Sequence, residues 1–386
     1  MNHNQFPSNP LSYLGLLAQN HAGEYVMTSF LQKEKTWKSF EKEISHLNEH
    51  TQDHRRSAVR IFEDFTKKHY KRNAEQVIDE LLKMKAESTQ EEYEDSLYGM
   101  LQDWITYCQK REYAPTTIRV AFTNLRIYLY FMGIKTDDQD VKHRITLPKK
   151  IKEERHPLSK YEYRLIVESM HDFPLRQAML LVLGSSGLRF GEAMKLRKKD
   201  LDTSGKRVRI HVRFNTKTRA GRTTFMSNEA YERLKSHLEK IGPDDYVFDD
   251  KKINYKNFQN IMIHALHRSC KRLGLDQKYE SNNIGIITSH SFRAYFFTKA
   301  ARKHGENYAH KLVGHGGYLM QYDRMTEDEK LEMYMDLEPD LVIYDQSKNE
   351  AELERLREEN QDLKEMKKEI QSLKDEIARK NQILEI

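Results

Sequence analysis

The sequence has little cysteine and no long hydrophobic run, and these two absences narrow the classes of protein that it can encode. Only Cys108 and Cys270 occur among 386 residues, which argues against a disulfide framework and favours a reducing compartment. No stretch approaches the roughly 18 consecutive apolar residues of a membrane span. The N-terminus lacks the basic-then-apolar order of a secretory signal. We therefore expect a cytoplasmic protein that has no membrane partner.

Metal-ligand patterns and a strong excess of one charge are also missing. The 17 histidines and two cysteines form no closely spaced set that resembles zinc ligands, so we expect no metal. The net charge is +6, and residues 1–347 alone carry +8 from 56 Lys/Arg and 48 Asp/Glu. This basic body suits a polyanionic partner, because lysine and arginine release counterions from phosphates. Ordinary lysine-rich solubility explains the same charge, so charge alone leaves both interpretations open.

The hydrophobic pattern predicts a mainly α protein with a small β-sheet (α+β). In the first third of the chain, apolar side chains recur at helical spacing. The expected helices cover residues 28–47, 51–70, 74–86, 90–110 and 115–132. We expect residues 1–49 to be a partly helical extension and residues 50–140 to be one compact helical domain. Residues 141–157 are basic and contain Pro148, which is typical of an extended linker.

A second domain is predicted over residues 158–346, where the pattern changes. Two short segments alternate apolar and polar residues as strands do, at 207–214 and 222–226. Helices are expected on both sides of this pair of strands. They cover residues 159–170, 174–186, 228–240, 254–273, 291–304 and 306–313.

Residues 347–386 carry a seven-residue apolar repeat in a highly charged segment. Its positions are Leu356, Leu363, Ile370, Ile377 and Leu384, with Met366 and Leu373 on the second seam. Glu359 and Lys380 interrupt that second seam, so the pattern predicts a short, imperfect coiled coil between copies of the chain. A single charged helix that folds back on the body is the alternative.

Residues suited to phosphoryl transfer are spread over the second half of the chain. They are Arg189, Lys217, His290, Arg293, His315 and several tyrosines that begin at Tyr318. Paired arginines can hold the non-bridging oxygens of a phosphodiester, and a tyrosine can attack the phosphorus. Each motif alone has a plain structural explanation: Glu192 would pair with Arg189 at a helix end, and Gly314-His315-Gly316 would form a turn. Their order and spacing together indicate one site.

In this order and spacing the residues resemble the tyrosine recombinase (phage integrase) family. The matching motifs are Ser186-Gly187-Leu188-Arg189 with Glu192, Thr216-Lys217-Thr218 before Arg222, His290 three residues before Arg293, and Leu312-Val313-Gly314-His315, 22 residues after that arginine. Residues 159–335 are similar to the catalytic domain and residues 50–140 to the core-binding domain of the family. Residues 317–324 resemble integrases of archaeal type. The resemblance implies a site-specific recombinase that cuts and rejoins double-stranded DNA through a covalent 3′-phosphotyrosine, without a cofactor.

The resemblance also implies a role for each site residue. Arg189 and Arg293 would clamp the scissile phosphate, and His315 would donate a hydrogen bond to a phosphate oxygen. Lys217 would protonate the departing 5′ oxygen. Only about one tyrosine hydroxyl in a thousand is ionised at neutral pH, because its pKa is about 10. The nucleophile therefore needs a proton acceptor or a strongly positive site, and His290 is the candidate base.

The nucleophile is the point at which the sequence departs from the family. About nine residues after His315, where many members have tyrosine, this chain has Arg324. Nearby candidates are Tyr318, Tyr322 and Tyr334. We favour Tyr322, because it lies just before a capping box at Thr326 that starts a helix. Tyr318 follows His315 too closely to turn back, and Tyr334 is expected to pack within that helix.

By family resemblance, the core-binding helices and the catalytic domain would clamp duplex DNA, with a dimer on each site and a tetramer in synapsis. Two other functions are consistent with the same residues. A type IB topoisomerase shares the phosphotyrosine chemistry, and a non-catalytic dimeric DNA-binding protein would use only the basic body and the coiled coil.

Overall fold

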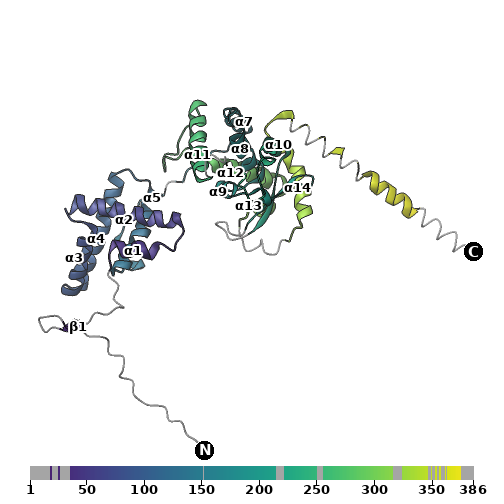
Figure 1. Ribbon diagram of the computed structural model, residues 1–386. Helices are drawn as coiled ribbons and strands as arrows, with labels where there is room; N and C mark the ends of the chain where they lie inside the picture. The colour runs from purple at the N-terminus through teal and green to yellow at the C-terminus, as the bar shows by residue number, and fades with distance from the viewer. Residues whose placement is uncertain are drawn as a thin grey trace, which may run out of the picture. The chain divides into compact units, whose positions relative to one another are not determined.

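The computed structural model describes most of the chain between residues 35 and 346. The described ranges are 35–150, 152–213, 221–249, 255–315 and 324–346, with the strand pair near the N-terminus and parts of 349–374. The chain divides into two compact units (Figure 1). The N-terminal unit comprises Met1–Glu153 with Glu280–Asn283, and the C-terminal unit comprises Glu154–Tyr279 with Ile284–Ile386. No helix in the described ranges is both long and apolar enough to cross a bilayer.

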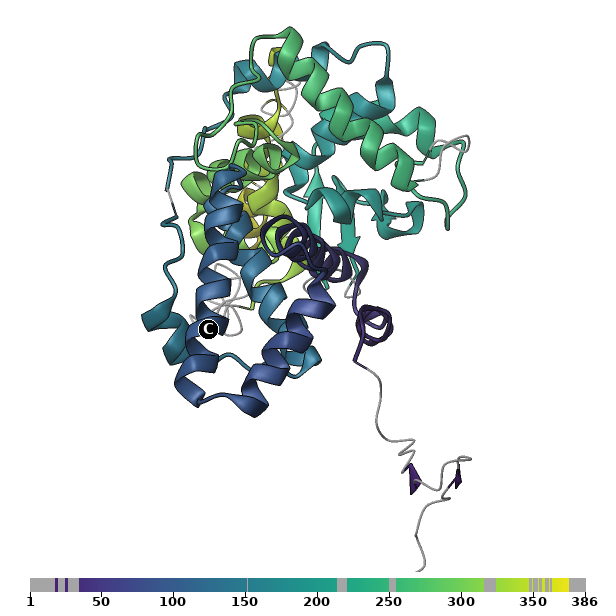
Figure 2. The same ribbon diagram turned by 90° about the vertical axis from the view of Figure 1, so that its left-hand side faces the viewer.

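The N-terminal unit is a bundle of helices, coloured purple to blue in Figure 1 and Figure 2. They are α1 (Trp37–Ile44), α2 (Glu49–His69), α3 (Ala74–Glu87), α4 (Gln90–Lys110), α5 (Pro115–Met132) and α6 (Asp138–Arg144), preceded by the antiparallel pair β1 (Ala18–Gln19) and β2 (Tyr25–Val26). Thr36, Asn73 and Thr89 each start a helix through a capping box. Phe62, Trp104 and similar side chains form its core.

The segment between the units corrects one prediction. We expected residues 141–157 to be extended, but residues 141–144 form the end of α6. Asp137 caps this helix by accepting hydrogen bonds from the N–H groups of Gln139 and Asp140. No residue of α6 is buried, so no apolar period marks it in the sequence.

The C-terminal unit consists of a three-stranded antiparallel sheet and helices that pack against it. The sheet order is β3 (Leu201–Asp202), β4 (Val208–Val212) and β5 (Arg222–Met226). Val208 pairs with Met226 and Val212 with Arg222. The helical elements are α7 (Lys160–Glu168), α8 (Pro174–Ser186), α9 (Phe190–Met194), η1 (Lys198–Asp200), α10 (Asn228–Leu238), α11 (Tyr255–Arg272), α12 (Ser289–His304), α13 (Glu306–Val313) and α14 (Glu327–Leu341). The predicted class, mainly α with a small β-sheet, is confirmed.

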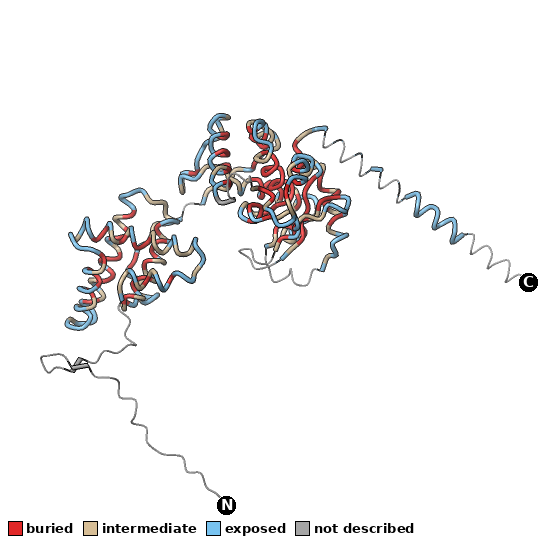
Figure 3. The backbone as a smooth tube through the Cα atoms, viewed as in Figure 1, coloured by how far each residue is buried: buried red, intermediate tan, exposed pale blue. Residues whose placement is uncertain are grey.

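Helix α8 is the central element of the C-terminal unit. It packs against α10 and α12, and every residue from 177 to 188 is buried (Figure 3). The helix ends at Gly187, whose φ of 65° is left-handed. A Cβ on Gly187 would lie 2.4 Å from a ring carbon of Phe296, so both the conformation and the space require glycine. Arg189 therefore directly follows a tightly packed, buried helix end.

The C-terminal segment is helical where it is described. Residues 363–374 form a helix, and the repeat residues Leu356, Leu363 and Ile370 are exposed, as are Met366 and Leu373 (Figure 3). Ile377 and Leu384 lie outside the described residues. An apolar seam is therefore open to solvent on this helix.

Candidate active site

Arg189 lies at the start of α9, directly after the end of α8. Its guanidinium donates from Nη1 to Oε1 of Glu192 over 2.9 Å. Its backbone N–H donates to Oε2 of the same carboxylate over 2.9 Å. The helix-end explanation of Arg189 is thus correct as geometry. The side chain is still 28% exposed, so the guanidinium is accessible to a ligand.

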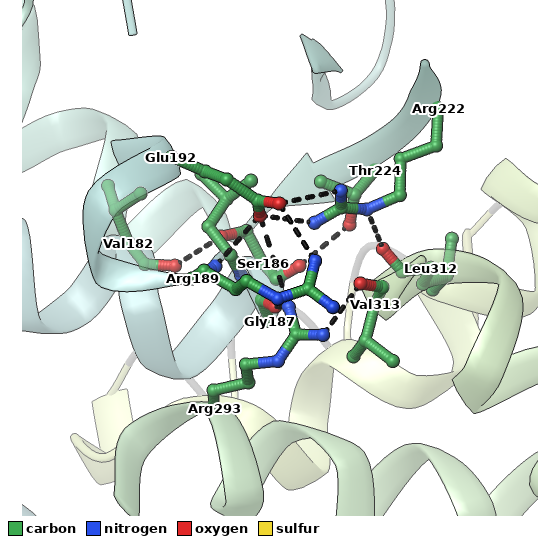
Figure 4. Close-up of polar contacts among 11 residues, drawn as sticks. Val182, Ser186, Gly187, Arg189, Glu192, Arg222, Thr224, Arg293, Leu312 and Val313 are labelled. Carbon is green, nitrogen blue, oxygen red and sulfur yellow. Dashed lines mark hydrogen bonds and ion pairs between the residues drawn. The ribbon is translucent and has the colours of Figure 1, made fainter. Parts of the chain in front are cut away.

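Arg293, on α12, lies beside Arg189 and Glu192 and is almost fully buried (Figure 4). It donates from Nη1 to the carbonyl of Gly187 over 2.5 Å and from Nη2 to the carbonyl of Val313 over 2.7 Å. These bonds hold the guanidinium between the ends of α8 and α13. Burial, and then Arg189 and Arg222, lower the pKa of Arg293 to about 10. Arg293 therefore keeps its positive charge at neutral pH.

Arg222, the first residue of β5, completes the group of charges (Figure 4). It donates to both oxygens of Glu192 and, from Nε, to the carbonyl of Leu312 over 2.8 Å. Burial raises the pKa of the Glu192 carboxyl, but the bonds and charge of Arg222, followed by those of Arg189, lower it below its ordinary value. Glu192 is therefore ionised at neutral pH.

This arginine cluster, Arg189, Arg222 and Arg293 around Glu192, has an uncompensated charge. Three guanidinium groups face one carboxylate, which leaves a net charge of +2. A phosphodiester gains negative charge as its phosphorus becomes five-coordinate, and fixed positive groups stabilise that state most. The cluster therefore offers fixed positive charge to an anionic group such as a phosphate.

Two histidines lie beside the arginine cluster. His290 is in the first turn of α12, which Thr288 and not His290 caps. Partial burial, and then Arg293, Arg189 and Arg155, lower the pKa of His290. Partial burial, and then Arg293, His310 and the other two cluster arginines, lower the pKa of His315. Both imidazoles are therefore neutral at neutral pH.

Gly314 lets the end of α13 approach the arginine cluster closely. Its φ is 69°, and a Cβ there would lie 2.7 Å from Cδ of Arg222. The backbone turn that follows α13 therefore places His315 next to the arginines.

Comparison with known proteins identifies the C-terminal unit. Residues 158–320 match the phage integrase family. They form a phage integrase domain. Enzymes of this family, the tyrosine recombinases, cut and rejoin DNA. No curated protein matches the chain.

Several solved structures are similar to this chain at low identity. A XerA recombinase is 18% identical, with a TM-score of 0.35, over 78% of this chain and 95% of that one. Lambda integrase bound to DNA is 14% identical, with a TM-score of 0.49, over 76% and 93%. The Tn1549 transposon integrase with circular-intermediate DNA is 16% identical, with a TM-score of 0.45, over 70% and 97%.

Four of the predicted site residues come together in the integrase domain: Arg189, His290, Arg293 and His315. Lys217, Tyr318 and Tyr322 lie outside the described residues. Tyr334 is fully buried in α14, and its hydroxyl donates to the carbonyl of Ser185 over 2.8 Å. Burial raises the pKa of Tyr334 well above its ordinary value, so this hydroxyl is unsuited to attack. Across the described ranges, no three His, Cys, Asp or Glu side chains lie together as metal ligands.

Sequence reasoning missed two arginines of the C-terminal unit. Arg222 stands in the motif only as a strand residue, although a basic residue at the first strand position after the lysine hairpin is a usable signal. Arg155 falls in the predicted linker, yet its guanidinium carbon lies 4.5 Å from the centroid of the Tyr279 ring. Its charge also contributes to the lowered pKa of His290.

Proposed function

We propose that this protein is a site-specific DNA recombinase that forms a covalent 3′-phosphotyrosine through Tyr322. The observation that carries the proposal is the arginine cluster, whose net charge of +2 lies beside His290 and His315. Arg189 and Arg293 hold the scissile phosphate in forked hydrogen bonds. His315 donates to a phosphate oxygen, and His290 accepts the tyrosine proton. Lys217 protonates the departing 5′ oxygen.

Contacts on both sides of the segment that contains Tyr318 and Tyr322 support a nucleophile within that segment. Before it, the end of α13 bonds to Arg222 through the carbonyl of Leu312. After it, Glu327 at the start of α14 accepts a hydrogen bond from Thr223 over 2.7 Å. Arg222 and Thr223 are neighbours on β5, so both flanks of the segment are attached beside the arginine cluster.

The predicted capping box at Thr326 is present: its hydroxyl and backbone bond reciprocally with Glu329. Tyr322 precedes this fixed helix start by four residues, which suits a side chain that reaches a phosphate and then withdraws. Tyr318 is the alternative nucleophile. The covalent intermediate conserves the bond energy of the phosphodiester, so no nucleotide cofactor is required.

The proposed DNA complex uses the whole chain. Double-stranded DNA is clamped by the helical domain, residues 50–140, and the catalytic domain, residues 158–346. The enzyme acts in the cytoplasm, at the nucleoid, and belongs to a mobile element. We expect a dimer on one site and a tetramer when two sites are paired. The segment 347–386 forms a coiled coil between copies of the chain through its apolar seam, because Leu363 and Ile370 are exposed to solvent.

Sedimentation tests the role of that seam. Replacing Leu363 and Ile370 with glutamate places charge in the seam and should lower the mass of the free protein. Glu365→Lys together with Lys368→Glu, which exchanges two exposed charges away from the seam on the same helix, should leave the mass unchanged. A chain without these changes that stays monomeric on paired target sites contradicts the assembly.

A nicked suicide substrate tests the chemistry. The unaltered protein should be trapped covalently on it, and Arg293→Ala should reduce trapping by about 10²–10³-fold, because a main transition-state contact is lost. Arg268→Ala, on the exposed face of α11, is the matched control. A pure DNA-binding protein gives no adduct, and relaxation of supercoils without site preference would indicate a topoisomerase instead.

A further inference from the structure

Two histidine rings share one proton position at the end of α13. Nδ1 of His310 lies 2.9 Å from Nδ1 of His315. The backbone N–H groups of Gly314 and His315 both donate to the carbonyl of His310, over 2.8 and 3.0 Å. This left-handed helix end brings together residues that are five apart in sequence. Both rings also pack against Phe297, with ring centroids 4.9 and 5.9 Å away.

A hydrogen bond between two Nδ1 atoms requires one proton between them. If His310 holds that proton, Nδ1 of His315 accepts, and neutral His315 carries its own proton on Nε2. If His315 holds the proton instead, its Nε2 has a lone pair and cannot donate to a phosphate oxygen. The direction of this one bond therefore decides whether His315 can perform its proposed role.

Charge around the pair favours the first arrangement. His315 faces Arg189 at the start of α9, Arg222 of β5 and Arg293 of α12, besides His310 of α13. Partial burial and repulsion from these arginines lower the pKa of His315, which disfavours a second proton on this ring. The incoming phosphate, an anion, also favours Nε2–H over a lone pair.

We propose that His310 is a positioning residue that donates its Nδ1 proton to Nδ1 of His315 and so directs Nε2–H of His315 toward the scissile phosphate. The proposal rests on the proposed function, because it gives a purpose to the tautomer of His315. His310 itself touches no substrate.

Asparagine and aspartate at position 310 form a matched pair of variants. Both place a polar atom where Nδ1 stands, but only the asparagine amide can donate. His310→Asn should keep adduct formation on the suicide substrate close to the unaltered rate. His310→Asp accepts from Nδ1–H of His315, so the rate at pH 8 should fall by about 10²-fold, the cost of one lost donor to a developing charge. His310→Phe should lie between these two. Equal rates for Asn and Asp would overturn the proposal.

Nitrogen NMR of the full chain tests the tautomer without any reaction. Histidine is labelled with ¹⁵N, inorganic phosphate fills the arginine cluster, and His315→Gln assigns the signal. We expect a protonated Nε2 and an unprotonated Nδ1 on His315 at neutral pH. A protonated Nδ1 on neutral His315 contradicts the proposal even if DNA cleavage is normal. Conversely, absence of any DNA adduct from the unaltered protein, with the expected tautomer present, refutes the proposed function and leaves the His310 contact standing.

Discussion

Arg222 and Glu192 form a two-point ion pair inside the integrase domain. Nη2 of Arg222 lies 2.6 Å from Oε2 and Nη1 lies 3.2 Å from Oε1 of the carboxylate. The two side chains are 8% and 5% exposed. Since Glu192 also bonds to Arg189, this one carboxylate orients two of the three guanidinium groups that would receive the DNA phosphate.

Removing the charge of Glu192 should destabilise the domain. Glu192→Gln leaves three guanidinium groups together without a buried counter-charge, and loss of one partner from a buried pair costs about 3–5 kcal/mol. The free energy of unfolding in urea measures this loss. Glu239→Gln, at an exposed position after α10, is the control and should change stability little. Equal stability of the two variants would contradict the central place given to Glu192.

Replacing Arg222 with lysine should slow DNA cleavage while retaining the charge. A lysine ammonium is a point charge and cannot bond to both oxygens of Glu192 and to the Leu312 carbonyl at once. We expect the rate of adduct formation to fall by about 10²-fold, as for loss of a preorganised contact. Arg233→Lys on α10 should cleave at the unaltered rate. If Arg222→Lys matches that control, Arg222 has no part in organising the site.

The pH dependence of cleavage should reflect His290. A base must be unprotonated, and the lowered pKa of His290 keeps it neutral below the ordinary histidine pKa of about 6.5. The cleavage rate should therefore begin to fall only below that pH. Arg155 contributes to the lowering, so Arg155→Ala should move this fall to higher pH, whereas Lys152→Ala should not. If Arg155→Ala leaves the pH of this fall unchanged, protonation of His290 is not the cause of the loss of cleavage at low pH.

The same pKa shift has a consequence for stability. Below pH 6.5 and above the lowered pKa, the unfolded chain binds a proton at position 290 that the folded chain does not. The contribution of His290 to stability is therefore present above pH 6.5 and is lost as the pH falls through this window.

Tyr334→Phe separates packing from chemistry. The hydroxyl of Tyr334 donates to the Ser185 carbonyl inside the core, so its removal should cost about 1 kcal/mol of unfolding free energy. Adduct formation should be unchanged. Loss of the adduct with stability intact would restore Tyr334 as the nucleophile.

The long elements could be predicted from the sequence because each buries one face. Helices α2 to α5 and strands β4 and β5 carry regular apolar periods, and their predicted bounds agree with the structure within about two residues. Helix α6 buries nothing, and β3 and α9 have only two and five residues. These elements have no period long enough to detect.

The site was predictable only where residues are close in sequence or belong to a family motif. The pair Arg189 and Glu192 is three residues apart, as expected at a helix start. Arg222 meets Glu192 from another element, 30 residues later, and no local pattern reports such a contact. The contact between the His310 and His315 rings likewise depends on the left-handed turn at Gly314, which the spacing of the two histidines does not reveal.

Peptide mapping of the trapped DNA adduct tests most directly whether one pocket joins these groups to a tyrosine. The protein is trapped on a nicked target, the complex is digested, and the modified peptide is sequenced by mass spectrometry. We predict the nucleotide on Tyr322, no adduct from Tyr322→Phe, and an undiminished adduct from Tyr318→Phe. A nucleotide on any other residue, or an adduct that survives in Tyr322→Phe, would contradict the assignment.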